Sequence, residues 1–469
     1  MAEIAPLTPL RYDLSRLGPA GLKNVVAPPY DVIDAAQRSE LLARDPYNIV
    51  RLILPEGQGD ESQGDERKGD AKYARASELL AAWRNEGVLV RDDEPAFYRY
   101  DQTFVLPGML VSGRSEITRR GFLGLVKLVS LDKGVVLPHE RTLSGPKEDR
   151  LKLFRATCTN LSPGFMLYRD PNQSLDSALA CATELTSFET PDGVRHALAK
   201  ITDPSAIEAI VACVAKSSLL IADGHHRYET ALRYCQEANA AVGGRSSQSV
   251  ANREHDYFMV FLTNGDDPNL VVLPTHRHIH SLPRFDFDEL CTGARALFDV
   301  TPLTRGASAD MLLSDLAKSG KERPSLVACA GDGRAALFAL KADANLASHP
   351  VLGKSPEVLR RTDVALLHMG ILEPMLGITA EAQAAKTNLW YPQDASIALG
   401  NLRGGSSVSG QVLFLMNASA VAQVRRVAEA GEVMPQKATF FYPKIMTGLA
   451  IHTLSHERIV NAPPTRSML

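Results

Sequence analysis

The sequence lacks the features that mark several large classes of protein. Its six cysteines are spread over 469 residues and none forms a C-x-x-C pair, so a cysteine zinc site is not expected. The apolar runs, such as SSLLIA and GFLGLVKLVSL, are too short or too interrupted to span a bilayer. A signal-peptide pattern is also missing. We therefore expect a cytoplasmic protein with reduced cysteines, several of them buried.

Charge of one sign is not in excess either. Lys and Arg number 51 against 54 Asp and Glu, for a net charge of -3, so neither nucleic acid nor a membrane is expected as a partner. The P-loop, the Rossmann glycine motif, the G-x-S-x-G elbow and H-E-x-x-H are absent. No zinc, haem or flavin is expected, a small molecule is the expected partner, and nothing in the sequence indicates an oligomeric state.

The chain is long enough for two or three domains. Strand-like and helix-like segments alternate, which predicts a mixed α/β or α+β fold. A change of character near residue 282 predicts an N-terminal region over 1–281 and a C-terminal α/β region over 282–469. The spacing predicts helices over 71–86, from about 147, and over 204–216, and strands over 218–223 and 256–263. The run PYNIVRLILP is interpreted as a short strand.

The strongest local signal is ADGHHRYETAL, residues 222–232. A buried strand leads through Asp223 and Gly224 into a helix N-terminus, where backbone N–H groups and the helix dipole favour anions. His225, His226 and Arg227 add donors, and an arginine can bind phosphate oxygens in pairs. The segment is a candidate phosphate site, in which Asp223 could hold Mg²⁺ or accept a proton.

An ordinary structural explanation exists for the same residues. Asp223 could simply cap the helix, with the histidines as satisfied polar groups near the surface. Adjacent histidines on a helix point about 100° apart, so His225 and His226 are a poor chelating pair. The position between a buried strand and an amphipathic helix favours the functional interpretation.

A second polar segment is PHERTLSGPKEDRLKLF, residues 138–154. Glu140 is a candidate general base if it lies partly desolvated beside the phosphate site. The remaining candidates in this segment are the polar and basic residues His139, Thr142, Lys147 and Arg150. From these residues alone, a solvated charged loop before a helix is the preferred interpretation.

A third segment, MPQKATFFYPKIMTG, places Lys437 and Lys444 on either side of an aromatic run. Both lysines could reach phosphates, or they could be exposed lysines of an edge strand. Weaker candidates are Tyr30 and Asp31 in APPYDVI, and His276 and Arg277 in PTHRHI. A further segment, RRTDVALLHMGIL, predicts a helix whose His368 is a core or cap residue.

Taken in order, these motifs resemble the bacterial and archaeal family named domain of unknown function 1015. The resemblance rests on APPYDVI, PYNIVRLILP, GFLGLVKL, PHERT with PKEDRL, ADGHHRYETAL, LPTHR, D-V-x-x-L-H and MPQKATFFYPK, and it spans residues 4–452. The D-G-H-H-R turn is similar to the nucleotide-binding turn of the ParB and sulfiredoxin superfamily. Where sulfiredoxin has a reactive cysteine, this sequence has His225, so thiol repair is not expected.

The turn is also similar to that of the ADP- or ATP-dependent free-serine kinases of this superfamily. That resemblance implies a ParB/sulfiredoxin-like core, ATP or ADP with Mg²⁺, and phosphoryl transfer to a small hydroxylated metabolite such as serine. It implies Glu140 as the base, or failing it Asp223, with His226 at the reacting centre. Two alternatives stay open: a nucleotide-binding switch of ParB type, and a phosphatase acting on phosphoserine-like metabolites.

Overall fold

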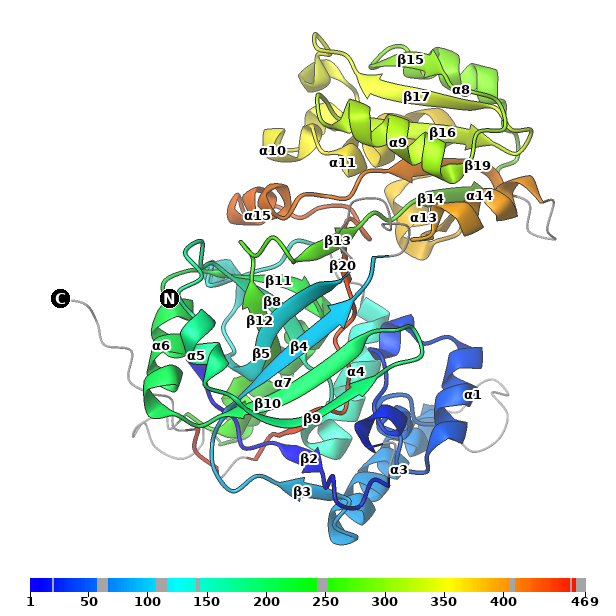
Figure 1. The fold of residues 1–469 in the computed structure, drawn as a ribbon. Helices are drawn as coiled ribbons and strands as arrows, with labels where there is room; N and C mark the ends of the chain where they lie inside the picture. The colour runs from blue at the N-terminus through cyan, green and yellow to red at the C-terminus, as the bar shows by residue number, and fades with distance from the viewer. Residues whose placement is uncertain are drawn as a thin grey trace. The chain divides into compact units, whose positions relative to one another are not determined.

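The computed structural model describes residues 1–18, 21–56, 66–106, 116–140, 144–242, 252–404, 410–455 and 458–460. The chain divides into two compact units with a sheet in each (Figure 1). Unit 1 comprises Met1–Leu137, Thr142–Val271 and Pro443–Leu469, and unit 2 comprises Pro138–Arg141 and Val272–Tyr442. The main division therefore falls ahead of residue 282. Pro138–Arg141 belongs to unit 2 although the residues on either side of it belong to unit 1, and Pro443–Leu469 returns to unit 1.

Unit 1 is built on a nine-stranded mixed sheet in the order β6-β11-β8-β12-β5-β4-β10-β9, with β1 beside β5. The pairs β11–β6 and β12–β8 are parallel and the others antiparallel. The strands are β1 (Ile4–Ala5), β4 (Phe97–Phe104), β5 (Ile117–Lys127), β6 (Val136–Leu137), β8 (Gly164–Tyr168), β9 (Thr183–Glu189), β10 (Arg195–Ile201), β11 (Leu219–Asp223) and β12 (Tyr257–Asn264). Two short pairs join β2 (Leu10–Tyr12) to β3 (Leu89–Arg91) and β7 (Thr159–Asn160) to β21 (His452–Thr453).

The helices of unit 1 follow from local signals and from burial. They are α1 (Ala35–Arg44), α2 (Val50–Ile53), α3 (Glu66–Asn85), α4 (Ser144–Thr157), α5 (Asp176–Ala180), α6 (Pro204–Val214) and α7 (His225–Val242), with 3₁₀ turns η1 (Gly21–Asn24), η2 (Tyr30–Val32), η3 (Leu131–Lys133) and η4 (Glu254–Asp256). Helix α6 starts where Asp203 accepts a hydrogen bond from the N–H of Ala206 and proline occupies the first turn. Apolar residues of α4, α5, α6 and α7 form one core with β8, β11 and β12.

Unit 2 has a six-stranded antiparallel sheet in the order β15-β17-β16-β19-β14-β18. Its strands are β14 (Arg277–His280), β15 (Phe298–Pro302), β16 (Ser325–Ala330), β17 (Ala335–Leu340), β18 (Leu389–Trp390) and β19 (Gly410–Met416), and β13 (Val271–Leu273) pairs with β20 (Phe440–Tyr442). Its helices are α8 (Phe287–Ala294), α9 (Ala309–Gly320), α10 (Glu357–Arg360), α11 (Asp363–Leu367), α12 (Glu373–Leu376), α13 (Ala380–Ala385), α14 (Ala395–Arg403) and α15 (Val421–Glu429), with η5 (Leu346–Ser348), η6 (Leu352–Lys354) and the π-helical turn η7 (His368–Leu372). Apolar residues of α9 and α14 pack on β16, β17 and β19 to form the core of this unit.

Most of the predicted elements are confirmed, with one clear error. The predicted helices correspond to α3, α4 and α6, and the predicted strands to β11 and β12. The strand predicted in PYNIVRLILP is wrong, because Val50–Ile53 forms the short helix α2. Three of its four residues are fully buried, and a short apolar run buried on every side has no periodicity that separates helix from strand. Among the described residues, no helix has the length and apolar character needed to cross a membrane.

Candidate functional site

The turn from β11 to α7 is built around Gly224. Its φ of +92° is a conformation that residues with a side chain rarely adopt. A Cβ at this position would lie 3.1 Å from the guanidinium carbon of Arg227. Helix α7 begins at the next residue, and its first hydrogen bond runs from the N–H of Tyr228 to the carbonyl of Gly224. The geometry therefore brings the N-terminus of an 18-residue helix and an arginine side chain to one turn.

Asp223 is the centre of a small charged cluster at this turn. Lys444 Nζ donates to one carboxylate oxygen at 2.9 Å, and Arg227 Nη2 donates to the other at 3.3 Å. Arg227 is 5% exposed and also donates to the carbonyl of Pro163. The lysine comes from the last segment of the chain, which belongs to unit 1. Among these three side chains, two positive charges surround one carboxylate.

The other residues of the predicted turn differ in exposure. His225 is buried at 8% exposure, and His226 is half-buried. Both have interactions of their own. Their backbone N–H groups lie in the first turn of α7, where a helix leaves such groups without intrahelical acceptors.

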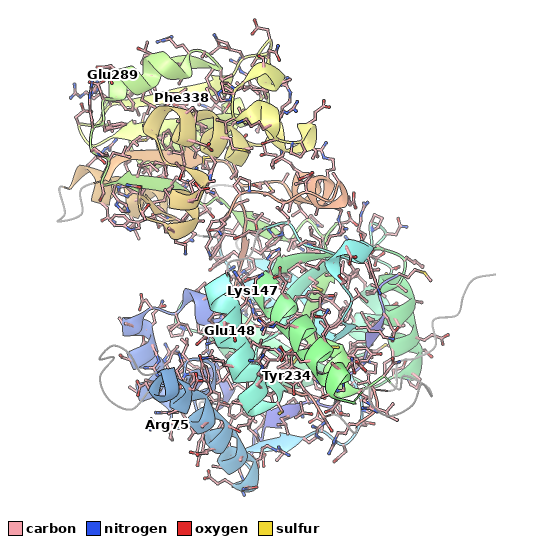
Figure 2. All side chains as sticks on the ribbon, turned by 180° about the vertical axis from the view of Figure 1, so that it is seen from behind. Arg75, Lys147, Glu148, Tyr234, Glu289 and Phe338 are labelled. Atoms are coloured by element: carbon pink, nitrogen blue, oxygen red, sulfur yellow. The ribbon has the colours of Figure 1, made fainter. Side chains whose placement is uncertain are left out.

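Helix α4 supplies two more of the predicted basic residues. Lys147 forms an ion pair with Glu229 of α7, and Figure 2 shows Lys147 and Glu148 on α4 beside the helix that carries Tyr234. Arg150 is 6% exposed and donates to the carbonyl of Ile53 at 2.6 Å. Thr142 lies outside the described residues, so its place in the site stays a prediction.

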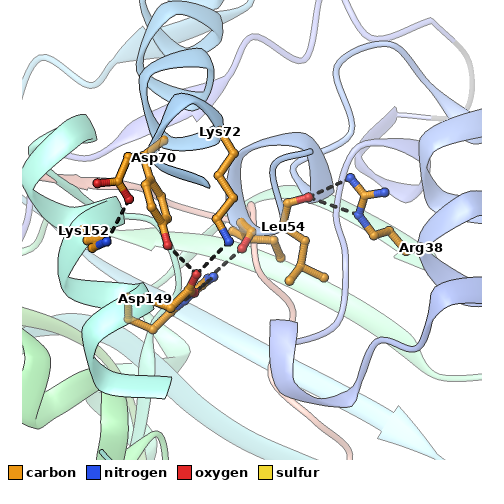
Figure 3. Close-up of polar contacts among 9 residues, drawn as sticks. Arg38, Leu54, Asp70, Lys72, Asp149 and Lys152 are labelled. Atoms are coloured by element: carbon orange, nitrogen blue, oxygen red, sulfur yellow. Dashed lines mark hydrogen bonds and ion pairs between the residues drawn. The ribbon is translucent and has the colours of Figure 1, made fainter. Parts of the chain in front are cut away.

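Arg150 is held by its neighbour Asp149, which bonds to α3 as well. Asp149 accepts hydrogen bonds from Lys72, Tyr73 and Arg150. Figure 3 shows the Lys72–Asp149 contact next to the Lys152–Asp70 ion pair that also joins α3 to α4. Despite partial burial, these cations and donors lower the pKa of Asp149 to about 2. The carboxylate is therefore charged at neutral pH and fixes the orientation of the arginine.

Tyr30 lies against Arg150 in the same region. The guanidinium carbon is 4.3 Å from the centroid of the tyrosine ring, which is the geometry of a cation–π contact. Burial raises the pKa of Tyr30, while the charges of Arg227 and Arg150 act in the opposite direction, so the phenol stays neutral at pH 7. Asp31, the other candidate of this turn, is exposed.

A small cavity of about 20 Å³ lies beneath these residues. Its lining combines Arg150, Arg227, Tyr30 and Ser162 with the apolar side chains of Ile53, Leu153, Phe154 and Leu161. That volume holds about one water molecule. The cavity is thus too small for a nucleotide. A nucleotide would have to bind outside it, on the accessible side of the Asp223, Arg227 and Lys444 cluster.

Sequence reasoning missed two buried polar residues that hold the Lys444 segment. Arg119 of β5 donates to the carbonyl of Pro443, and Gln102 of β4 donates to the carbonyl of Lys444. Charged and polar residues in a strand ordinarily indicate a solvent-facing side, so no pattern in FYRYDQTF or TRRGFLGL separates these residues from exposed ones.

The remaining predicted residues gather in unit 2. Glu140 pairs with Met434 in a parallel β-bridge, and His139 bonds to Thr439 at 2.9 Å. Arg277 is 1% exposed and donates to the carbonyls of Gln436 and Lys437. His139, Glu140 and Arg277 therefore all contact residues 434–439 within this unit.

Two histidines of this cluster are structural. His276 Nδ1 accepts from the backbone N–H of Met416 at 3.1 Å, and burial lowers the pKa of His276 to about 4. His368 Nε2 accepts from Arg277 at 3.0 Å, and burial lowers its pKa to about 3. Both imidazoles are neutral at pH 7. The prediction that His368 is a core residue is confirmed, since it is 2% exposed.

The described residues contain no group of three or more His, Cys, Asp or Glu side chains that could hold a metal ion. Both oxygens of Asp223, the ligand suggested by the sequence, already accept from Lys444 and Arg227. A metal ion at Asp223 would have to compete with these two cations for the carboxylate.

A family model described as protein of unknown function (DUF1015) matches residues 4–365. The chain belongs to this family. No curated protein matches its sequence. A free serine kinase in complex with AMP is 11% identical, with 69% of this chain and 93% of that one covered and a TM-score of 0.34. A conserved hypothetical protein from Pyrococcus furiosus is 14% identical, with 68% and 90% covered and a TM-score of 0.32.

A third structure, SbnI with a C-terminal truncation from Staphylococcus aureus, is 12% identical, with 71% of this chain and 90% of that one covered and a TM-score of 0.33. At such identities and TM-scores, what this member of the family does has to be argued from its own residues. Its fold is a mixed α/β arrangement with a large mixed sheet.

Proposed function

We propose that this protein transfers a phosphoryl group from ATP or ADP to a small hydroxylated metabolite, with serine as the first acceptor to test. The proposal places a ParB/sulfiredoxin-like nucleotide-binding core in unit 1. The observation that carries it is the cluster of Lys444, Asp223 and Arg227 at the N-terminus of α7. Phosphoryl transfer depends on positioning and charge stabilisation more than on covalent chemistry.

Charge and backbone geometry support phosphate as the ligand. Lys444 and Arg227 bring two positive charges to the carboxylate of Asp223, and both side chains can also donate to phosphate oxygens. The first-turn N–H groups of α7, at His225 and His226, add directed donors. Gly224 lacks a side chain that would cover them. A phosphate at this position would replace Asp223 as the partner of at least one cation.

Three further residues complete the proposed phosphate site. Tyr30 contributes a neutral hydroxyl donor beside Arg150 and Arg227. The guanidinium of Arg150 lies close to the proposed site and packs against the ring of Tyr30, which orients that ring. Lys147 is paired with Glu229 at the start of α7, so it can turn to a bound phosphate at the cost of one partly exposed ion pair.

The base is proposed from the resemblance to the free-serine kinases. That resemblance names Glu140, with His226 beside the reacting group. Asp223 is the weaker choice, because a proton on its carboxylate would break its ion pairs with Lys444 and Arg227. We propose Asp223 as a positioning residue for these two cations. Glu140 and Lys437 both belong to unit 2; Glu140 is proposed from the resemblance alone, and Lys437 is not part of the proposed unit 1 site.

The test is phosphoryl transfer from ATP and from ADP to serine and a panel of small alcohols. Lys444→Met, Arg227→Met and Glu140→Gln run beside the wild type. Lys127→Met is the matched control, since Lys127 also pairs with a carboxylate of unit 1, Glu3, at 3.0 Å. Phosphorylated product that survives in the control and is lost in the other three supports the kinase and identifies its acceptor.

Other results lead to the alternatives. Nucleotide binding that needs Lys444 and Arg227, without any transfer, favours a nucleotide-dependent switch. Hydrolysis of a phospho-amino acid without nucleotide favours a phosphatase. Transfer that is unchanged in Lys444→Met and Arg227→Met would overturn the proposed phosphate site itself.

A further inference from the structure

Arg119 is a charged residue in a place that is costly for charge. It lies near the start of β5 and is fully buried, with 0% exposure. Loss of water lowers the pKa of Arg119 to about 9, even though Tyr100 and the carboxylate of Asp223 raise it. The guanidinium is therefore charged at neutral pH. A well-packed apolar residue would often serve stability equally well, so the position calls for a reason other than stability.

The hydrogen bonds of Arg119 lead directly to the backbone of Lys444. Its Nη2 donates to the carbonyl of Pro443 at 2.6 Å and also to Gln102 Oε1. Because that oxygen faces the arginine, the amide nitrogen of Gln102 faces the other way and donates to the carbonyl of Lys444 at 2.9 Å. Gln102 and Arg119 are direct cross-strand partners in β4 and β5. Arg119 thus fixes the carbonyl of Pro443 and Gln102 fixes that of Lys444, and the two side chains are themselves hydrogen-bonded to each other.

Aromatic rings hold the guanidinium in place. Its carbon lies 4.8 Å from the ring centroid of Phe165 and 5.5 Å from that of Phe261. Gly121 leaves room for this packing, since a Cβ there would lie 2.4 Å from the Phe261 ring. The guanidinium of Arg119 therefore has little freedom to move. The two groups that accept hydrogen bonds from it, the carbonyl of Pro443 and the side-chain oxygen of Gln102, are held in place as well.

We propose that Arg119 is a positioning residue that acts through Lys444 and aims its ammonium group at the anion bound beside Asp223. The inference rests on the proposed function, because it assigns a task to Lys444 in that phosphate site. Lysine has a long flexible side chain, and fixing its backbone removes much of the conformational freedom that an ion pair would otherwise lose on forming. Arg119 would thereby make Lys444 a directed ligand.

Unit 2 contains the same construction. Arg277 is 1% exposed, lies 5.2 Å from the ring centroid of Tyr391, and donates to the carbonyls of Gln436 and Lys437 at 3.2 and 3.0 Å. For each lysine of the MPQKATFFYPK segment, a fully buried arginine from elsewhere in the chain donates to the carbonyl of the preceding residue, Pro443 or Gln436. The repetition in two separate units argues that the arrangement serves the lysines and not only the local packing.

A double-mutant cycle tests whether Arg119 acts through Lys444. The affinity for ADP is measured by calorimetry for the wild type, Arg119→Met, Lys444→Met and the double variant, with Arg227→Met as a separate check on the phosphate site. We expect each single change to weaken binding by about tenfold, the loss of one charge-assisted hydrogen bond. The double variant should bind no more than about twofold weaker than Lys444→Met, because Arg119 has no task once the lysine is gone.

Each other outcome has a distinct meaning. Losses that multiply in the double variant, or an unchanged affinity in Arg119→Met, would overturn the positioning role and leave the proposed function intact. Unchanged affinity in both Lys444→Met and Arg227→Met, or no binding by the wild type, would overturn the proposed function and this inference with it. If Arg119→Met fails to fold, Arg119→Lys takes its place in the cycle with the same criteria, since lysine keeps the charge but has a shorter side chain and lacks the planar guanidinium that lies against Phe165 and Phe261.

Discussion

Lys444 and Asp223 are 221 positions apart in the chain, and their side chains meet at 2.9 Å. The contact brings the last segment of unit 1 to the turn that opens α7. A phosphate bound at this turn, as we propose, would have to compete with the Asp223 carboxylate for Lys444 and Arg227, so its affinity should depend on the charge of residue 223.

Lys444→Met is expected to weaken ADP binding by about tenfold, while Lys444→Arg should retain most of the affinity. The reason is the loss of a charge that is held against the site by Gln102 and Arg119. Titration calorimetry measures the effect, and Lys127→Met controls for removing an ion-paired lysine. Equal affinity of the wild type and Lys444→Met would contradict a phosphate-binding role.

Asp223→Asn is expected to act in the opposite direction. Without its negative charge, the side chain of residue 223 competes less with a bound phosphate for Lys444 and Arg227, so ADP affinity measured with EDTA should rise several-fold. Asp92→Asn is the matched control, since Asp92 also lies between an arginine and a lysine, at 2.6 Å from Arg11 and 3.8 Å from Lys200. It should lose stability without any gain in affinity.

The same variant decides whether Asp223 binds a metal ion. If its carboxylate were a Mg²⁺ ligand, Asp223→Asn would bind ADP more weakly than the wild type when Mg²⁺ is added. A gain in affinity both with and without the metal is the result that the ion pairs predict.

Gly224→Ala is expected to cost about 1–2 kcal/mol of folding stability, because alanine is strained at a φ of +92°. It should also weaken ADP binding, since the new Cβ would crowd the Arg227 guanidinium at 3.1 Å. Gly134→Ala provides the comparison, because Gly134 also has a positive φ, of +64°, but a Cβ there would meet no other atom within 4 Å. Equal binding by the two variants would show that Arg227 is not disturbed.

The sequence was sufficient for the local part of this site and insufficient for the long-range part. A buried run, a glycine and 3.6-residue periodicity predicted β11, the turn and α7, because all three signals act within one short segment. The pairing of Lys444 with Asp223 depends on how β4 and β5 hold a distant segment, which no local pattern encodes. The error in PYNIVRLILP has the same origin, since the burial that selects the helix comes from the rest of the unit.

Arg119 shows most clearly what could not be predicted from the sequence. In TRRGFLGLVKL the two arginines are identical by sequence, yet Arg119 is 0% exposed and Arg120 is exposed. Alternation in a strand predicts that one of them points inward, but it does not predict which one. The aromatic rings of Phe165 and Phe261, which make its burial tolerable, come from other strands.

His196 is expected to make unit 1 sensitive to acid. Its Nδ1 accepts from the hydroxyl of Tyr100 at 2.6 Å, and its Nε2 bonds to Thr190 at 2.9 Å. Burial lowers the pKa of His196 from 6.5 to about 4, so the unfolded chain binds a proton below pH 6.5 that the folded protein does not. The contribution of this histidine to stability therefore falls as the pH drops from 6.5 to 4, by about 1.4 kcal/mol per pH unit.

The measurement is the free energy of unfolding by denaturant across that pH range for the wild type and His196→Gln. Glutamine can accept from Tyr100 and donate to Thr190 without titrating, so its stability should fall less steeply with acid. The difference between the two slopes isolates His196 from the other titrating groups, which are common to both proteins. Identical slopes would mean that the imidazole takes up its proton in the folded state, and the hydrogen bonds that fix its neutral form would then not hold in solution.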